Sequence, residues 1–398
     1  MSKSTKMLLK KICKLINNTG LGDYWNEGSV KLRNIYMIIT FTAYIIMVLL
    51  ENLAACFGDF PKVEKNSSVM FSVIHNTVLA KMFLLLYHKK SIRKLNSEMA
   101  LLGADMEDDV TMNKQYKKVK YGLLLYVVSV YLSLLAYGVD SLSKCFKNIF
   151  CFIPGTPFYT VVTYYPSYNS TTDVASALRV FFYMTWLYMM LPMMAADCLP
   201  IVHLIIMAYK FITLCNHFKN ISKDFTRNKT NMRKESAVLK LKFGCMQGIL
   251  MHRKLILLIK EVNRVFGIIM SLQVCESSAV AVLLLLRLAI SPRQNLTDAI
   301  MTYTFVSSLF ILLALNLWNA GEITYQASLL SFEIYSCGWH LCNMFPQHQR
   351  DIKYLVLISS AQAQKSLILK AFAIQELSYA TFVSVARLTY SIFAVFYK

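Results

Sequence analysis

Several ionisable side chains lie inside long apolar stretches of this sequence, where a charge is energetically unfavourable. They are Glu51, His75, Lys81, Glu276, Glu322 and Arg387. Such groups could carry protons or ions across a membrane, or they could be polar contacts between helices, which we favour for each. Glu276 is the exception, because it lies in the middle of its stretch beside Ser277 and Ser278 and cannot reach a membrane surface. It therefore requires a buried partner.

Motifs of enzymes are absent from the sequence. It has no Gly-rich phosphate loop, no His-Glu-x-x-His and no nucleophile elbow. Of the ten cysteines, only Cys145 and Cys151 share a predicted outer loop, and a disulfide between them is not favoured. Cys337 and Cys342 lie near His340 but lack a second pair of zinc ligands. We therefore expect no catalysis, no metal and no cofactor.

Membrane-spanning helices must position the ionisable groups. Apolar residues make up 56% of the chain, whereas about 45–50% is usual in globular proteins. The apolar stretches predict spans at 34–57, 68–88, 121–138, 175–213, 262–286, 299–328 and 374–397. Because no repeat or linker divides the sequence, we predict one all-α domain, residues 1–398, with seven transmembrane helices.

The net charge of +20 is distributed unevenly among the segments between the spans. Lys-rich and Arg-rich segments alternate with poor ones, beginning with a basic N-terminal segment. Basic loops stay on the cytoplasmic side, so we predict a cytoplasmic N-terminus and an extracellular C-terminus. The charge then reflects topology and contact with the lipid bilayer, and nucleic acid is not an expected partner. Asn169, in the longest outer loop, is the expected glycosylation site.

The fourth apolar stretch is too long for one bilayer crossing. We expect Asp197 near the inner boundary, hydrated, with the helix continuing into the cytoplasm. Segments 214–260 and 329–370 are helix-compatible and follow long spans. They predict a cytoplasmic helical layer in which the subunits of an oligomer could meet.

The N-terminal segment has the pattern of an amphipathic helix. Leu8, Leu9, Ile12, Leu15 and Ile16 share one helical face, whereas Lys10, Lys11 and Lys14 lie on the other. Such a helix either lies on the inner membrane surface or packs against the other helices. The sequence leaves both alternatives open.

Aromatic and methionine side chains gather in the predicted outer halves of the spans. The candidates for a ligand pocket are Phe71, Ile74, His75, Leu134, Tyr137, Phe181, Phe182, Met184, Thr185, Tyr188, Met301, Tyr303 and Phe305. Small-molecule sites are mostly apolar with a few polar groups, and methionine adapts to the shape of a ligand. Helix packing with an interfacial aromatic belt explains each residue singly. The density of the group favours a buried pocket.

Short motifs near the C-terminus form a pattern. They are the pair Tyr335 and Trp339, then Gln364-Lys365, Thr381-Phe382, Arg387 and Tyr390-Ser391. With the inverted topology, this pattern resembles the insect odorant receptor family, in which lysine is more usual at the place of Arg387. Gustatory receptors typically have glutamine where Phe396 stands. The family's co-receptor has a longer inner loop, so the chain resembles a ligand-specific, or tuning, subunit.

The resemblance implies a ligand-gated, non-selective cation channel that works in olfaction. The subunit would bind a small volatile organic ligand and form a heterotetramer with the co-receptor in the plasma membrane, in the dendrite of a sensory neuron.

The resemblance also implies that residues 374–398 line the pore, with the family's hydrophobic gate position at Phe393. Phe396 falls where the co-receptor has a polar pore residue. Helical spacing places Ala386, Thr389, Phe393 and Phe396 on one face. An apolar ring can close a pore by dewetting. The alternative is that this face packs against spans five and six.

A G-protein-coupled seven-helix receptor is the main competing interpretation. It requires the opposite orientation, and the sequence lacks Asp-Arg-Tyr after span three and Asn-Pro-x-x-Tyr in span seven. A transporter is a third, for which repeat symmetry and broken helices are expected.

Overall fold

The protein is almost entirely helical in the computed structural model. The structure describes residues 4–26, 31–60, 62–151, 163–167, 170, 172–231, 234–290, 296–342, 346–372 and 375–396. The helices are α1 (Thr5–Asn18), α2 (Lys31–Phe57), α3 (Lys62–Tyr87), α4 (Lys89–Leu101), α5 (Asp109–Cys151), α6 (Asp173–Asn231), α7 (Lys234–Ile290), α8 (Leu296–Tyr335), α9 (Pro346–Ala363) and α10 (Tyr379–Phe396). Two 3-10 turns, Ala104–Met106 and Trp339–Leu341, and an antiparallel pair of strands, β1 (Lys370–Ala371) and β2 (Gln375–Glu376), complete the described elements. The predicted all-α fold is confirmed.

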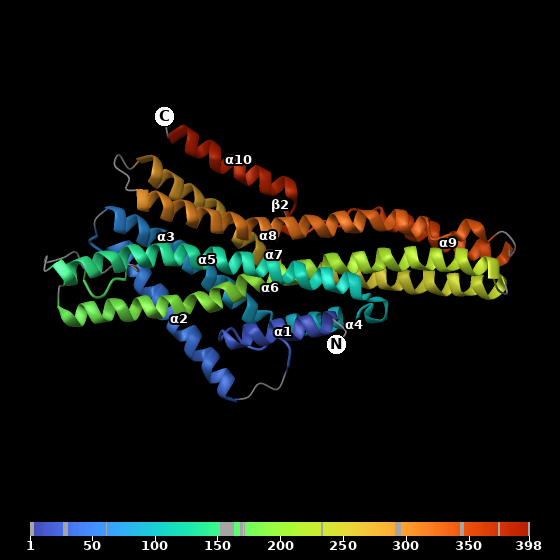
Figure 1. Ribbon diagram of the computed structural model, residues 1–398, viewed down its shortest axis with the longest axis horizontal. Helices are drawn as coiled ribbons and strands as arrows, with labels where there is room; N and C mark the ends of the chain where they lie inside the picture. The colour runs from blue at the N-terminus through green and yellow to red at the C-terminus, as the bar shows by residue number, and fades with distance from the viewer. Residues whose placement is uncertain are drawn as a thin grey trace.

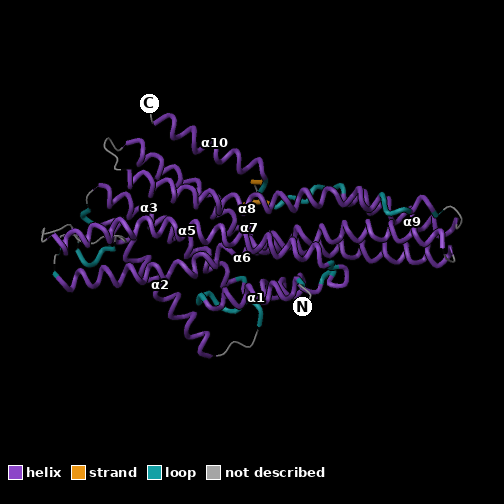
Figure 2. Tube along the Cα trace, viewed as in Figure 1, coloured by secondary structure: helices purple, strands orange, loops and turns teal. Residues whose placement is uncertain are grey.

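The helices form a broad bundle that narrows into a rod along the long axis (Figure 1). α2, α3 and α5 belong to the bundle, whereas α6, α7 and α8 run on from it into the rod, where α9 packs against α7 and α8. α10 stands at the margin of the bundle and contacts α7 and α8. Figure 2 shows the short strand pair at the start of α10, between two otherwise helical regions.

Six of the helices in the described ranges are long and apolar enough to cross a membrane. The most apolar window of α6 is 94% buried. A helix that is apolar on all sides belongs in the centre of a bundle, and α6 is that helix here. α10, at the predicted seventh span, has 18 residues, which corresponds to about 27 Å at 1.5 Å per residue.

The segments predicted as a cytoplasmic layer lie in the rod. Residues 214–260 cover the end of α6 and the start of α7, which turn back on each other there. Residues 329–370 cover the end of α8, all of α9 and the approach to β1. The rod is thus built largely from extensions of the spanning helices α6, α7 and α8.

α1 packs against α4 and α6 with most of its apolar face, whereas Leu15 is 57% exposed. Leu8, Leu9, Ile12 and Ile16 are at most 6% exposed, and α1 contacts α4 and α6. Burial raises the pKa of the Cys13 thiol to about 12, with a smaller contribution from the charge of Asp23, so this thiol stays protonated at neutral pH. The packing expected from the second alternative for the N-terminal helix is observed.

Candidate ligand pocket and terminal helix

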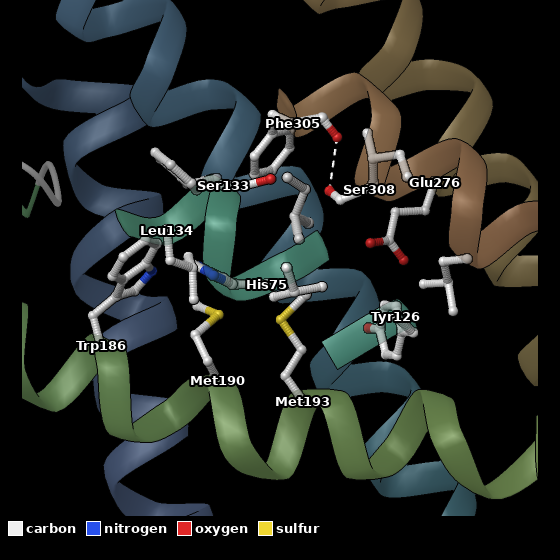
Figure 3. Close-up of a pocket in the computed structure, with 15 residues that line it drawn as sticks. His75, Tyr126, Ser133, Leu134, Trp186, Met190, Met193, Glu276, Phe305 and Ser308 are labelled. Atoms are coloured by element: carbon white, nitrogen blue, oxygen red, sulfur yellow. Dashed lines mark hydrogen bonds between the residues drawn. The ribbon is translucent and has the colours of Figure 1, made fainter. Parts of the chain in front are cut away.

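A small cavity lies inside the bundle, between α3, α5, α6, α7 and α8 (Figure 3). Its volume is about 40 Å³, little more than the ~30 Å³ that one water occupies in the liquid. Sites for drug-sized ligands have about 300–1,000 Å³. The cavity is therefore closed around a small space, and a ligand must displace side chains to enter.

Aromatic rings form one wall of the cavity. Phe71 stacks on His75, with ring centroids 5.8 Å apart. It meets Trp186 edge to face at 5.7 Å and Phe305 edge to face at 6.3 Å. Met190 and Met193 point into the same space from α6 (Figure 3). Because methionine changes rotamer readily, these two side chains form the wall that can yield to a ligand.

A buried ionic cluster forms the floor. The Lys81 ammonium, which is 0% exposed, donates to Asp197 Oδ1 at 3.1 Å and to Glu276 Oε2 at 2.6 Å. It also donates to Gln273, and Tyr126 Oη donates to Asp197 Oδ2 at 2.8 Å. Tyr126 and Glu276 line the cavity, so the cluster borders it directly. Burial of charges is tolerated only with such pairing.

This cluster answers two expectations from the sequence. Glu276 has the buried partner that it required, and the partner is Lys81. The expectation that Asp197 stays hydrated is wrong, since Asp197 is 4% exposed and paired with Lys81. The helix α6 continues far beyond Asp197 inside the protein, so this residue is covered by neighbouring helices.

A second polar pair, His75 and Glu51, lies beside the aromatic wall. His75 Nδ1 lies 2.5 Å from Glu51 Oε2, and both residues are buried. A smaller void beside the cavity is bordered by Tyr44, Glu51, His75 and Trp186. Among the residues that the structure describes, Tyr44 Oη, Glu51 Oε1 and Trp186 Nε1 have no hydrogen-bond partner. Buried polar atoms usually have partners, so Tyr44 and Trp186 are available to donate to a polar atom of a ligand.

Five of the residues proposed from the sequence meet at this cavity. They are Phe71, Ile74, His75, Leu134 and Phe305. The others lie elsewhere: Phe181, Met184 and Tyr303 are 60%, 60% and 59% exposed.

The remaining candidates do not line the cavity. Thr185 bonds to its own helix at Phe181 O, Phe182 is half-buried, and Met301 is buried away from the cavity. Tyr188 Oη lies 2.5 Å from Tyr36 Oη, on the α2 side of α6. The side chain of Tyr137, like those of Cys145 and Cys151, lies outside the described part of the chain.

Sequence reasoning missed the α6 stripe Trp186, Met190 and Met193. These positions are spaced i, i+4 and i+7, which places them on one helical face. Of the proposed α6 residues, Phe182 lies on this face one turn before Trp186 but does not line the cavity. Phe181, Met184, Thr185 and Tyr188 lie on other faces of the same helix. This spacing was the available signal. It does not show which face of the helix points toward a cavity when every face is apolar. Ser308 on α8 and Tyr126 on α5 were missed for the same reason.

The terminal helix and the segment that leads to it are bonded to α7 and α8. The Phe372 N–H donates to Ser271 Oγ at 2.8 Å, and the Lys370 N–H donates to Asn263 Oδ1 at 3.0 Å. Tyr379 Oη donates to Glu322 Oε2 at 3.0 Å. Glu322, one of the ionisable residues within the spans, thus holds the first turn of α10.

The exposure of the α10 side chains shows which face of this helix packs on the protein. Thr389 is 2% exposed and bonds to Val385 O at 2.9 Å, and Ala386 is half-buried. Arg387, Leu388 and Tyr390 lie on the exposed side. The side chains of Phe393 and Phe396 lie outside the described residues, as does Asn169.

Comparison with known proteins gives one family. Residues 62–390 match the family described as 7tm Odorant receptor. The structure of the insect olfactory receptor OR5 from Machilis hrabei is similar to this one, with a TM-score of 0.78 and 13% sequence identity over 98% of this chain and 97% of that chain. The structure of the same receptor in complex with eugenol gives the same values. A search of curated proteins finds no match.

Proposed function

This chain belongs to the 7tm odorant receptor family, and from that premise we propose that it is the odorant-binding subunit of a ligand-gated, non-selective cation channel that acts with a co-receptor. The observation that carries the proposal is the position of the cavity. Its floor is built on α7 at Glu276, and the same helix holds the approach to α10 through Ser271. A ligand that moves α7 therefore acts on the terminal helix.

The proposed ligand is a small volatile organic molecule with an apolar body and an oxygen atom. Eugenol, which is bound in the related OR5 structure, has both features. Here the apolar body would lie against Phe71 and Phe305, and its oxygen would accept from Trp186 Nε1. A hydrogen bond of this kind supports recognition because the donor is buried and otherwise unpaired.

Replacing Trp186 by phenylalanine tests this contact. An aromatic ring is kept, whereas the pyrrole half of the indole and its N–H donor are lost, so we expect the half-maximal concentration for oxygen-bearing odorants to rise about three- to tenfold, as the loss of one hydrogen bond implies. Hydrocarbons of the same size accept no hydrogen bond and should show no such rise. Concentration–response currents measure both. Trp25→Phe, in the loop before α2, is the matched control; an equal shift for hydrocarbons would show that Trp186 acts only by packing.

The proposed route from the cavity to the pore runs along α7. Ser271 precedes Glu276 by five residues, or about 7.5 Å of helix, and accepts from the Phe372 N–H beside the start of α10. A rigid helix transmits a displacement over this length. The proposal is that odorant entry shifts the α7 floor and that α10, which would line the pore, follows through this bond.

Loss of the Ser271 hydroxyl should weaken that coupling. We expect Ser271→Ala to lower the maximal odorant-evoked current several-fold at equal surface expression, because the Phe372 N–H loses its acceptor. Ser278→Ala is the control, since in the described part of the chain the Ser278 hydroxyl bonds within α7, to Val274 O. An unchanged maximal current in Ser271→Ala would contradict the route.

Assembly with a co-receptor into a heterotetramer is proposed for the rod. Phe243, Phe332 and Ile358, on α7, α8 and α9, are 68%, 67% and 69% exposed. Apolar surface of this kind is typical of subunit contacts. The proposed setting is the plasma membrane, with a cytoplasmic N-terminus, an extracellular C-terminus and glycosylation at Asn169.

Currents in a cell that lacks other odorant receptors test the function. Co-expression with the co-receptor should give odorant-evoked cation currents that persist when G-protein signalling is blocked. The co-receptor alone should respond to its own agonist and not to the odorant. Currents that disappear under the block would reject the channel proposal and favour a G-protein-coupled mechanism.

A further inference from the structure

A larger groove lies on the other side of the α5–α6 pair from the odorant cavity. It has a volume of about 690 Å³ and is bordered by α1, α5 and α6. α6 contributes Leu191 and Met194 to the groove, whereas Met190 and Met193 face the cavity. The two spaces are therefore separate, and the groove has no part in the proposed odorant site.

One stripe of α5 runs through the groove from charged to apolar residues. Its members are Lys117, Lys120, Leu124, Val127 and Tyr131, each three or four residues after the one before. This spacing keeps them on one helical face. The 14 steps along the chain from Lys117 to Tyr131 correspond to about 21 Å of helix. The groove is thus polar at one end and apolar along the rest of its length.

The charged end of the groove is entirely basic. Lys11 on α1 joins Lys117 and Lys120 there, and none of the described groove residues is acidic. In the described part of the chain these three ammonium groups form no ion pair; Lys120 lies 6.0 Å from the centroid of the Tyr121 ring. Lys120 is also the last lysine before the long apolar run of α5. The lysines therefore lie at the level where a membrane changes from headgroups to hydrocarbon.

We propose that this groove binds one molecule of an anionic phospholipid. The phosphate lies among Lys11, Lys117 and Lys120, and an acyl chain lies along Leu124 and Val127 against α6. Charge complementarity selects the headgroup, because lysines near the surface attract anionic lipids. The apolar stripe selects a molecule with a long chain over a free phosphate. The leaflet is the one on the side of the N-terminus. The site stands independently of odorant gating.

Lipid retention by the purified full-length protein tests this site. The protein is reconstituted with equal amounts of phosphatidylserine and phosphatidylcholine, extracted in mild detergent and measured by native mass spectrometry. We expect one retained phosphatidylserine, favoured at least about tenfold over phosphatidylcholine, since three lysines act together. Lys11→Gln/Lys117→Gln/Lys120→Gln should reduce that preference to near unity.

The control removes equal charge from the same two helices. Lys10→Gln/Lys14→Gln/Lys114→Gln, all outside the groove, should keep both the retained lipid and the preference. Leu124→Trp fills the apolar arm without changing charge and should lower retention of either lipid. An equal loss in both triple variants would mean a diffuse layer of anionic lipid and would overturn the site. Equal retention of the two lipids by the unmodified protein would also overturn it.

Discussion

Replacing Lys81 by methionine should lower the free energy of unfolding by about 3–5 kcal/mol, the usual effect of removing one partner of a buried ion pair. Lys81 is the cation that faces both Asp197 and Glu276, and all three groups are buried. Methionine fills a similar volume, so the lost stability is electrostatic in origin and does not come from a new cavity. Thermal unfolding of the purified protein and its amount at the cell surface measure the effect.

Two further variants separate this cause from general damage. Lys94→Met removes a lysine whose side chain is 78% exposed and whose Nζ lies 3.8 Å from Glu98 Oε1. This variant should change the free energy of unfolding by less than about 1 kcal/mol. Lys81→Met/Asp197→Asn/Glu276→Gln removes the charges together and should recover part of the loss. If Lys81→Met unfolds at the temperature of the unmodified protein, the cluster does not stabilise the fold.

The sequence predicted the helices well because apolar length is a local property. The window of each span is visible in the sequence, and so is the continuation of the fourth stretch beyond Asp197. The partner of Glu276 was not visible, because Lys81 lies 195 residues away. Which of the ionisable groups within the spans meet depends on the order of helices around α6, and no local pattern contains that order.

The sequence identified some residues of the cavity and missed others for a related reason. On α3, Phe71, Ile74 and His75 share one face and were identified. On α6 and α8 the proposed Phe181 and Tyr303 lie on the outer surface. In a membrane, lipid-facing and protein-facing sides are both apolar, so hydropathy does not distinguish them. Packing decides the face, and the aromatic residues on the lipid side resemble those of a pocket.

Enlarging or filling the cavity should change which sizes of odorant are effective, in opposite directions. Met190→Ala removes a flexible side chain from the wall, and Ser308→Met adds one. We expect Met190→Ala to favour larger odorants over smaller ones by about tenfold or more, since one methylene in an apolar pocket changes selection by about 10–200-fold. Ser308→Met should reduce odorant-evoked current below about a tenth, because the cavity has only about 40 Å³ and overpacking is unfavourable.

Tyr303→Ala is the matched control for this pair. Tyr303 is on the same helix as Ser308 but is 59% exposed, so its removal should leave the order of odorants unchanged. Currents evoked by a co-receptor agonist should persist in all three variants, which shows that the channel still assembles. A changed order in Tyr303→Ala, together with an unchanged order in Met190→Ala and Ser308→Met, would place the ligand on the outer surface of α8. The cavity between Phe71 and the Lys81 cluster would then be a packing feature of the bundle, and the route along α7 would lose its starting point.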